Sequence, residues 1–204
     1  MTQDARPARS SLKQVRTLLW VLVALAIAGA AALVRLPQVK SGTSAQADFG
    51  GPFTLIGGDG KPFSSASLAG KPYAIYFGFT RCGDVCPTTL ARLVKLRNAS
   101  GGDDAFNIVF VTIDPTNDGP KEVGQYATLF NAPIIGLTGS AAQIDQVKKQ
   151  YGIFAEPAPH AMPGKEMEHT ATVVLFDRNG KLAGTIATDE SDSAALAKLK
   201  NLAA

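Results

Sequence analysis

An apolar strand that runs directly into a pair of cysteines most restricts the folds open to this chain of 204 residues. The run Tyr73–Phe79 (YAIYFGF) has strand length and is rich in aromatic residues, which is typical of a central strand buried on both faces. Cys82 and Cys86 follow, and Pro87 begins a helical pattern. In open α/β sheets, functional residues lie where a buried strand ends and a helix begins. We therefore expect the chemistry of this chain in the loop after residue 79.

The remaining pattern predicts a mixed sheet covered by helices on both faces, the arrangement of a thioredoxin-like α/β fold. Strands are expected over residues 53–56, 61–63, 73–79, 108–113, 172–176 and 181–186, with a hairpin turn at Asn179-Gly180. Helices are expected over residues 87–97, 121–130, 140–151 and 189–202. Ser140 is the expected N-cap of the third helix and Gly152 its stop. The segment that carries His160, Met162, Met167 and His169 is interpreted as a proline-rich loop.

Near the N-terminus, Leu18–Val34 contains no charged residue. A helix of this length rises about 1.5 Å per residue and just spans the hydrocarbon of a bilayer. We predict a cytoplasmic tail at residues 1–17, a transmembrane helix at 18–36, a linker at 37–48 and an exported domain at 49–204, because basic residues precede the apolar run. The alternative is a cleaved signal peptide, with small residues at cleavage spacing between Ala28 and Ala32.

Charge is distributed unevenly along the chain, whose net charge is +3. Six of the 20 Lys and Arg residues and two of the 17 Asp and Glu residues fall in residues 1–48, so that segment carries +4 and the rest −1. The basic character therefore belongs to the tail. The predicted domain has no electrostatic footprint for nucleic acid.

The two cysteines restrict the kinds of metal site that the chain can build. Two cysteines are too few for a disulfide-rich scaffold, a four-cysteine zinc site or an iron–sulfur cluster. Two thiolates favour soft metals, and His169 is the best candidate for a third ligand. It precedes the strand 172–176 without the proline that thioredoxin-type domains carry there. Two thiolates and one imidazole suit Cu(I) and can also hold Cu(II). If Cys86 caps the following helix, the pKa of its thiol should fall.

Other readings of the same residues remain open. The two cysteines could form a structural or reversible disulfide, and His169 could be an ordinary histidine. Asp114 is either a turn former before Pro115 or a residue close to the metal, and Asp84 is either a solvated carboxylate or a contact for metal or partner. The further candidates for transient ligands, which could equally be incidental loop residues, are His160, Met162 and Met167.

Five blocks of sequence carry a resemblance to a known family. They are YFGFTRCGDVCPTTLARL, VTIDPTNDGP, FNAPIIGLTGS, YGI and EHTATVVLFDRNGK, within about residues 53–184. The chain resembles the Sco/SenC family of copper chaperones. The resemblance implies a membrane-anchored, thioredoxin-like domain in which Cys82, Cys86 and His169 bind copper. It also implies a role in assembling the dinuclear copper centre of cytochrome c oxidase.

The resemblance extends to partners and location. It implies the copper-centre subunit of cytochrome c oxidase as recipient and a periplasmic copper donor as a further partner. The corresponding location is a bacterial-type inner membrane, with the domain on the periplasmic side. The chain departs from the family pattern at Arg81 and Gly83, where histidine and proline are usual. These departures remove no expected ligand.

Three functions from different classes fit the pattern. A copper chaperone, which is not an enzyme, is the leading reading and requires His169. A thiol–disulfide oxidoreductase would use Cys82 and Cys86 to reduce the cysteines of the copper recipient and does not require the histidine. A thiol peroxidase is the weakest reading, since the residues that such enzymes place around the reactive cysteine are not recognisable here.

Overall fold

The computed structural model describes residues 15–25, 49–162 and 165–203. The chain divides into two compact units, Met1–Gln46 and Ala47–Ala204. Residues 15–25 are helical, and residues 18–25 of this helix belong to the predicted transmembrane segment. Within the described residues, no helix has both the length and the apolar character that a membrane crossing requires. Residues 26–36 of the predicted span, and the linker after them, lie outside the described residues.

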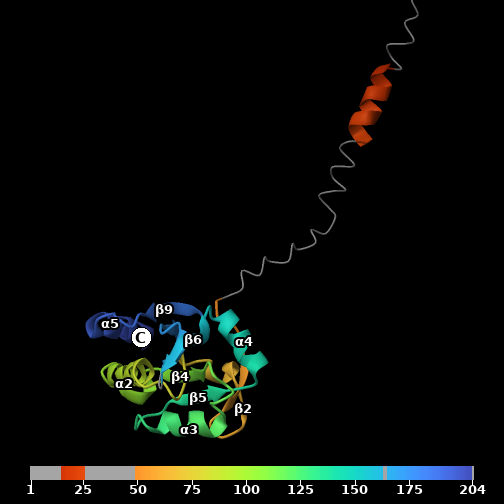
Figure 1. Ribbon diagram of the computed structural model, residues 1–204. Helices are drawn as coiled ribbons and strands as arrows, with labels where there is room; N and C mark the ends of the chain where they lie inside the picture. The colour runs from red at the N-terminus through yellow and green to blue at the C-terminus, as the bar shows by residue number, and fades with distance from the viewer. Residues whose placement is uncertain (1–14, 26–48, 163–164, 204) are drawn as a thin grey trace, which may run out of the picture. The chain divides into compact units, whose positions relative to one another are not determined.

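A seven-stranded mixed sheet forms the centre of the second unit (Figure 1). Its strand order is β2-β1-β5-β4-β3-β8-β9, and β3, β4 and β5 are parallel neighbours. The strands are β1 Thr54–Gly57, β2 Pro62–Ser64, β3 Tyr73–Gly78, β4 Asn107–Thr112, β5 Ile135–Thr138, β8 Val173–Phe176 and β9 Leu182–Ile186. All six residues of β3 are buried, as expected of a strand covered on both faces. The two predicted hairpins are confirmed as the antiparallel pairs β1–β2 and β8–β9.

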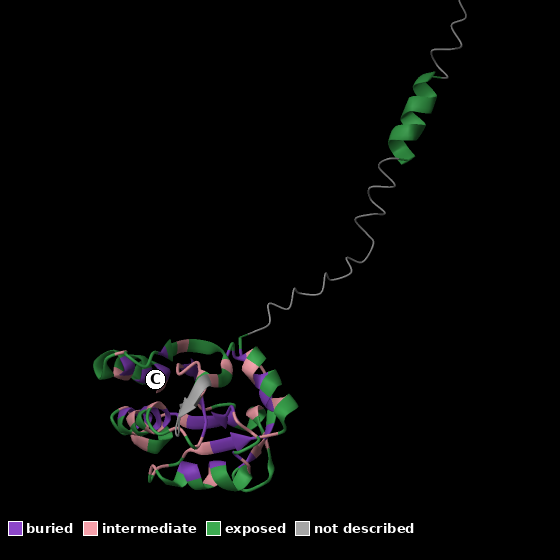
Figure 2. Cartoon of the chain, in the orientation of Figure 1, coloured by how far each residue is buried: buried purple, intermediate pink, exposed green. Residues whose placement is uncertain are grey.

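Helices cover both faces of this sheet. They are α2 Val85–Asn98, α3 Pro120–Thr128, α4 Ala141–Gln150 and α5 Asp192–Ala203, with short 3₁₀ turns η1 Ser65–Leu68 and η2 Gly102–Asp104. Side chains alternate along a strand, so neighbouring residues of the sheet reach opposite layers. Phe110 lies with its ring 5.1 Å from that of Tyr126 in α3, whereas Phe77 lies 5.5 Å from Tyr151 at the end of α4. Figure 2 shows the central strands buried between these layers.

Local sequence signals place several helix ends. Ser140 accepts the N–H of Gln143, and the Gln143 side chain accepts the N–H of Ser140, which completes a capping box at the start of α4. Gly152 ends that helix with φ of 60°, a left-handed conformation that glycine adopts without strain. The Ser191 hydroxyl likewise accepts the N–H of Ala194 at the start of α5. The first two of these signals confirm predictions made from sequence.

The structure corrects three expectations. Helix α2 begins at Val85, so Pro87 occupies its third position, where a missing N–H still costs no helical bond. Residues 135–138 form β5, which the sequence analysis did not predict. The expected proline-rich loop is instead a two-stranded hairpin of β6 Ala155–Met162 and β7 Lys165–His169, with Ala155 paired to His169.

Candidate metal centre

The loop between β3 and α2 places the first cysteine against the start of the helix. A turn in which the Cys82 N–H donates to the Phe79 carbonyl ends the strand. Asp84 occupies the N-cap position of α2, but its side chain makes no capping hydrogen bond. The Cys82 sulfur lies 3.4 Å from the backbone N–H of Cys86 and accepts from it. A free N–H at a helix N-terminus is usually capped by a side-chain oxygen, and here the Cys82 sulfur is the acceptor instead.

The second cysteine lies inside the core. Cys86 is fully buried at the second position of α2. Burial and, to a smaller extent, the hydrogen bond with Cys82 together raise the pKa of its thiol to about 12, which outweighs the lowering effects of the Phe79 backbone and the Tyr76 side chain. The expectation that the helix terminus would lower this pKa is therefore wrong. Desolvation of the thiolate exceeds the stabilisation that the helix end supplies.

Gly78, the last residue of β3, makes room for this sulfur. A Cβ at that position would lie 2.9 Å from Cys86 Sγ, 3.1 Å from Tyr76 and 3.2 Å from Phe110. Any side chain here would therefore displace the Cys86 sulfur or the two rings. The sequence analysis did not single out Gly78, although a glycine inside a buried strand is a signal of close approach.

His169 reaches the site from a distant part of the chain. It is the last residue of β7, and its Nε2 lies 3.8 Å from Cys86 Sγ. Its Nδ1 lies 3.0 Å from the Thr170 carbonyl oxygen. A carbonyl can only accept, so Nδ1 carries the proton and, in the neutral ring, Nε2 presents its lone pair toward the sulfur. This orientation matches that of metal-binding histidines, whose second nitrogen donates to a fixed acceptor.

Aromatic rings hold the imidazole and keep it neutral. The Tyr76 and Phe79 rings have their centroids 6.3 and 6.0 Å from that of His169, both in edge-to-face geometry. Burial lowers the pKa of His169, and the hydrogen bond to the Thr170 backbone opposes this shift in part. A neutral imidazole is the form that binds a metal ion.

The fold therefore brings the three predicted residues to one end of the sheet, with Cys86 in contact with both others. Both cysteines are free thiols. Among the described residues, no three or more His, Cys, Asp or Glu side chains are already arranged so that they could hold a metal ion together. Two adjacent thiols beside an imidazole can bind a soft metal ion or exchange with another disulfide.

The structure also places the remaining candidates. The Asp114 carbonyl accepts the N–H groups of Asn117 and Asp118, as a turn former does, while its carboxylate accepts from Arg81 and Asn117. Asp84 is exposed.

Two of the hairpin candidates are placed only by their backbone. His160 and Met162 belong to β6, but their side chains lie outside the described set. The Met167 side chain packs against the core.

Comparison with known proteins identifies the family of this chain. A family model described as SCO1/SenC matches residues 41–204. The chain belongs to the SCO1/SenC family. The solved structure of ScoI from Bradyrhizobium japonicum with copper bound is 35% identical and has a TM-score of 0.67, over 76% of this chain and 99% of that one.

Curated members of the SCO1/SenC family are similar in sequence. The mitochondrial protein SCO2 of Saccharomyces cerevisiae is 32% identical over 155 residues, which is 74% of this chain and 52% of the relative. A putative copper-binding protein of Stutzerimonas stutzeri is 31% identical over 134 residues, 65% of this chain and 66% of the relative. The chain thus spans about half the length of the yeast relative.

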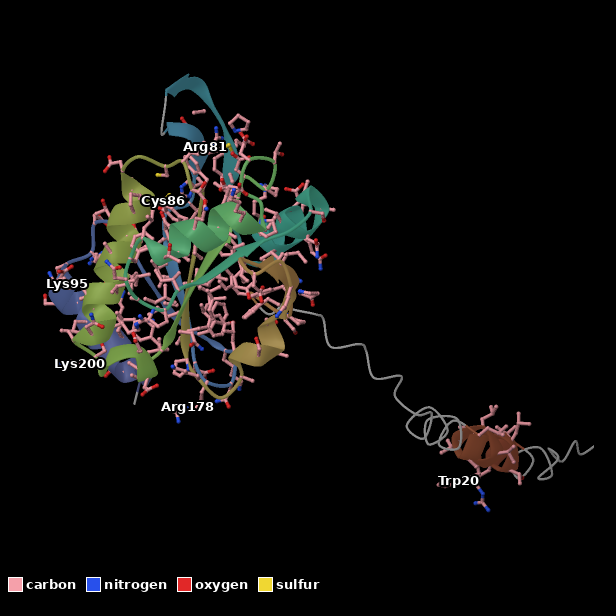
Figure 3. All side chains as sticks on the ribbon, turned by 90° about the horizontal axis from the view of Figure 1, so that it is seen from below. Trp20, Arg81, Cys86, Lys95, Arg178 and Lys200 are labelled. Carbon is pink, nitrogen blue, oxygen red and sulfur yellow. The ribbon has the colours of Figure 1, made fainter. Side chains whose placement is uncertain are left out.

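This SCO1/SenC member has an ion pair at the position where the sequence departs from the family pattern. The sequence analysis noted Arg81 as a departure from the family pattern, and its guanidinium lies 2.8 Å from the Asp114 carboxylate. Figure 3 shows Arg81 and Cys86 at one end of the domain and Arg178 at the opposite end. Arg81 therefore adds an ion pair next to Cys82, and the contacts of Cys86 with Cys82 and His169 are present beside it.

Proposed function

We propose that this chain is a membrane-anchored copper chaperone in which Cys82, Cys86 and His169 hold one copper ion as cargo. One observation carries this proposal. The Nε2 lone pair of His169 is directed at Cys86 Sγ across 3.8 Å, although the two residues are 83 positions apart in the chain. A hydrogen bond at Nδ1 fixes that orientation. A ring held in this way is prepared to share a metal ion with the sulfur.

The comparisons support copper as the cargo. The matching structure from B. japonicum was determined with copper bound, and the relative from S. stutzeri is named a putative copper-binding protein. The donor set is consistent with this choice, because two thiolates and one imidazole suit Cu(I) and can also hold Cu(II). The family resemblance further suggests that the recipient is the copper-centre subunit of cytochrome c oxidase and that a periplasmic protein supplies the metal.

Uptake of copper would require changes at both cysteines. The Cys82 sulfur would leave the N–H of Cys86 and turn toward the ion, and the Cys82 and Cys86 thiols would each release a proton to solvent on binding. His169 would need no deprotonation, because burial keeps its imidazole neutral. Release would proceed by ligand exchange, in which thiolates of the recipient replace the three ligands one at a time.

We also propose that the N-terminal segment retains the chain in the inner membrane, with its domain on the periplasmic side. The proposal rests on the uncharged run Leu18–Val34 and the basic residues before it. The helix observed at residues 15–25 is consistent with this proposal. A tether would keep the domain close to a recipient that is itself in the membrane.

A second candidate function is thiol–disulfide exchange with the recipient. It is favoured by the proximity of the two free cysteines, since Cys82 Sγ contacts the backbone of Cys86. Cys82 is partly accessible, while Cys86 is buried, so Cys82 would attack the disulfide of a partner and Cys86 would resolve the mixed disulfide. This reaction would reduce the cysteines of the recipient before they receive copper.

A titration with Cu(I) tests the leading proposal. The reduced chain is titrated without oxygen against a chromophoric Cu(I) chelator, in parallel with His169→Ala and the matched control His160→Ala. We expect one tightly bound copper ion per chain, with affinity weakened more than about tenfold by His169→Ala and unchanged by His160→Ala. Weak binding to the wild type, or equal binding without His169, would place thiol–disulfide exchange first.

A further inference from the structure

Asp118 is a fully buried acidic residue, yet it lies outside the three proposed ligands. Its carboxylate accepts three hydrogen bonds from neutral donors. The Thr80 N–H donates at 2.8 Å, the Thr80 hydroxyl at 2.6 Å and the Thr112 hydroxyl at 2.7 Å. Burying a carboxylate is costly unless its oxygens are paired in this way. Two of its three partners belong to one residue, Thr80.

Thr80 is the point at which the chain leaves β3 for the cysteine loop. It stands two residues before Cys82, and both its N–H and its hydroxyl are bound to Asp118. The next residue, Arg81, pairs with Asp114 at 2.8 Å. Both residues that precede Cys82 are therefore tied to carboxylates of one loop, one inside the core and one at the surface.

Asp118 is itself fixed to the neighbouring strands. Thr112 ends β4 and donates to the carboxylate, while Thr138 ends β5 and donates its hydroxyl to the Asp118 carbonyl at 2.6 Å. The Asp118 N–H donates to the Asp114 carbonyl at 2.9 Å. Through its side chain and backbone, Asp118 thus joins the ends of β4 and β5 to Thr80, which follows β3. The cysteine loop begins at that end of β3.

We propose that Asp118 is a positioning residue for the copper site, holding Thr80 so that Cys82 stays beside Cys86. This inference rests on the proposed function, because it assigns Asp118 a role in copper binding. Asp118 acts through Thr80 and touches neither the sulfur atoms nor the imidazole. The geometry separates its two sets of bonds, since the carboxylate joins the cysteine loop to β4 while the carbonyl holds β5.

This separation supplies the variants for a test. Asp118→Ala removes all three carboxylate bonds. Asp118→Asn keeps the shape, and its amide can accept the Thr80 N–H through oxygen while donating to the Thr80 hydroxyl, so it should restore the loop. The matched control Thr138→Val removes a buried hydrogen bond to the same residue but leaves Thr80 bound. Thr80→Val removes only the hydroxyl bond, and serves if Asp118→Ala fails to fold.

The experiment uses the reduced full-length chain in detergent and has two readouts. The first is the rate at which iodoacetamide modifies Cys82 in the metal-free chain, followed by mass spectrometry of the cysteine peptides. The second is the Cu(I) affinity in competition with a chelator. We expect Asp118→Ala to accelerate Cys82 modification several-fold and to weaken Cu(I) binding about tenfold, the range of residues that orient metal ligands. Asp118→Asn and Thr138→Val should stay near wild type, and Thr80→Val should change both readouts less, in the same direction.

The two readouts distinguish failure of the positioning role of Asp118 from failure of the proposed copper-binding function. Equal acceleration of Cys82 modification in Asp118→Ala and Thr138→Val would show general loosening and overturn the positioning role. Unchanged modification in both Asp118→Ala and Thr80→Val would overturn it as well. Failure of the wild type to bind Cu(I) tightly would instead overturn the proposed function, and with it the copper role of Asp118.

Discussion

The Cys86 thiol controls how this site responds to pH. In an unfolded chain a cysteine ionises near 9.0, whereas burial raises the pKa of Cys86 to about 12. Between these values the unfolded chain loses a proton that the folded chain keeps, so this thiol makes the folded state less stable as pH rises from about 9 to about 12. At neutral pH the metal-free site therefore keeps its buried sulfur protonated.

Alkylation of Cys86 should show this shift. In the reduced metal-free chain, we expect iodoacetamide to modify Cys86 slowly at pH 8 and at a rate that continues to rise above pH 9, because the thiolate is the reactive form. Peptide mass spectrometry over a pH series measures the rate, and the urea-unfolded chain is the control, in which the rate should level off near pH 9. Levelling at that pH in the folded chain would contradict the shift.

Gly78→Ala tests the fit of the Cys86 sulfur. The new Cβ would lie 2.9 Å from Cys86 Sγ, so we expect a loss of about 1–3 kcal/mol in the free energy of unfolding, measured in urea. In a Cys86→Ala background the sulfur is absent, and the same substitution should cost less. An equal loss in both backgrounds would mean that Tyr76 and Phe110, rather than the sulfur, limit the space.

Part of this site could be predicted from the sequence. Cys82, Cys86 and His169 were predicted as metal ligands from their residue types and from the strand and helix patterns around them, and the structure places Cys86 in contact with the other two. The environment of Cys86 was not predictable in this way, because its burial depends on Gly78, Tyr76 and other core residues that the sheet brings together. The role of Asp118 likewise depends on contacts with residues 38 and 20 positions away.

At the scale of the element, α4 depends on its capping box. Ser140→Ala removes the hydroxyl that accepts the Gln143 N–H, and we expect it to lower the free energy of unfolding by about 1 kcal/mol. Urea denaturation measures the effect. Ser140→Asp keeps an acceptor at the N-cap and should stay close to wild type. A loss of the same size in Ser140→Asp would show that the side chain matters for packing rather than for capping.

Elements with a strong local pattern were predicted, and those defined by tertiary contact were not. Strand β3 is apolar along its length, which the sequence displays directly. Strand β5 has only four residues, which is too short for a clear local pattern. Its Gly136 lies so close to α3 that a Cβ there would be 2.6 Å from the Val123 carbonyl, and this tertiary contact is not visible in the sequence. Strand β6 contains two prolines, which count against a strand until its pairing with β7 is known.

At the scale of the whole molecule, the proposed anchor predicts how the chain fractionates. We expect the full-length chain to remain with membranes during alkaline carbonate extraction, because an apolar helix of this length resists release. The matched control begins at residue 49, keeps the unit that contains the sheet, and should be released. Immunoblotting of the fractions measures both. Release of the full-length chain, or a shortened product in the periplasm, would favour the cleaved signal peptide.

The hydrogen bond from the Cys86 N–H to the Cys82 sulfur has a consequence for the proposed delivery of copper. Small zinc domains fold only when their metal arrives, so their binding energy is largely folding energy. In this chain the Cys82 sulfur that would take the ion also accepts a backbone N–H from the first turn of α2, so it is part of the fold. Binding of copper would then replace the hydrogen bond to Cys82 Sγ with a metal–sulfur bond, in a domain that is already folded. A recipient would need to outcompete three ligands without unfolding the protein that delivers them, and delivery could be reversed.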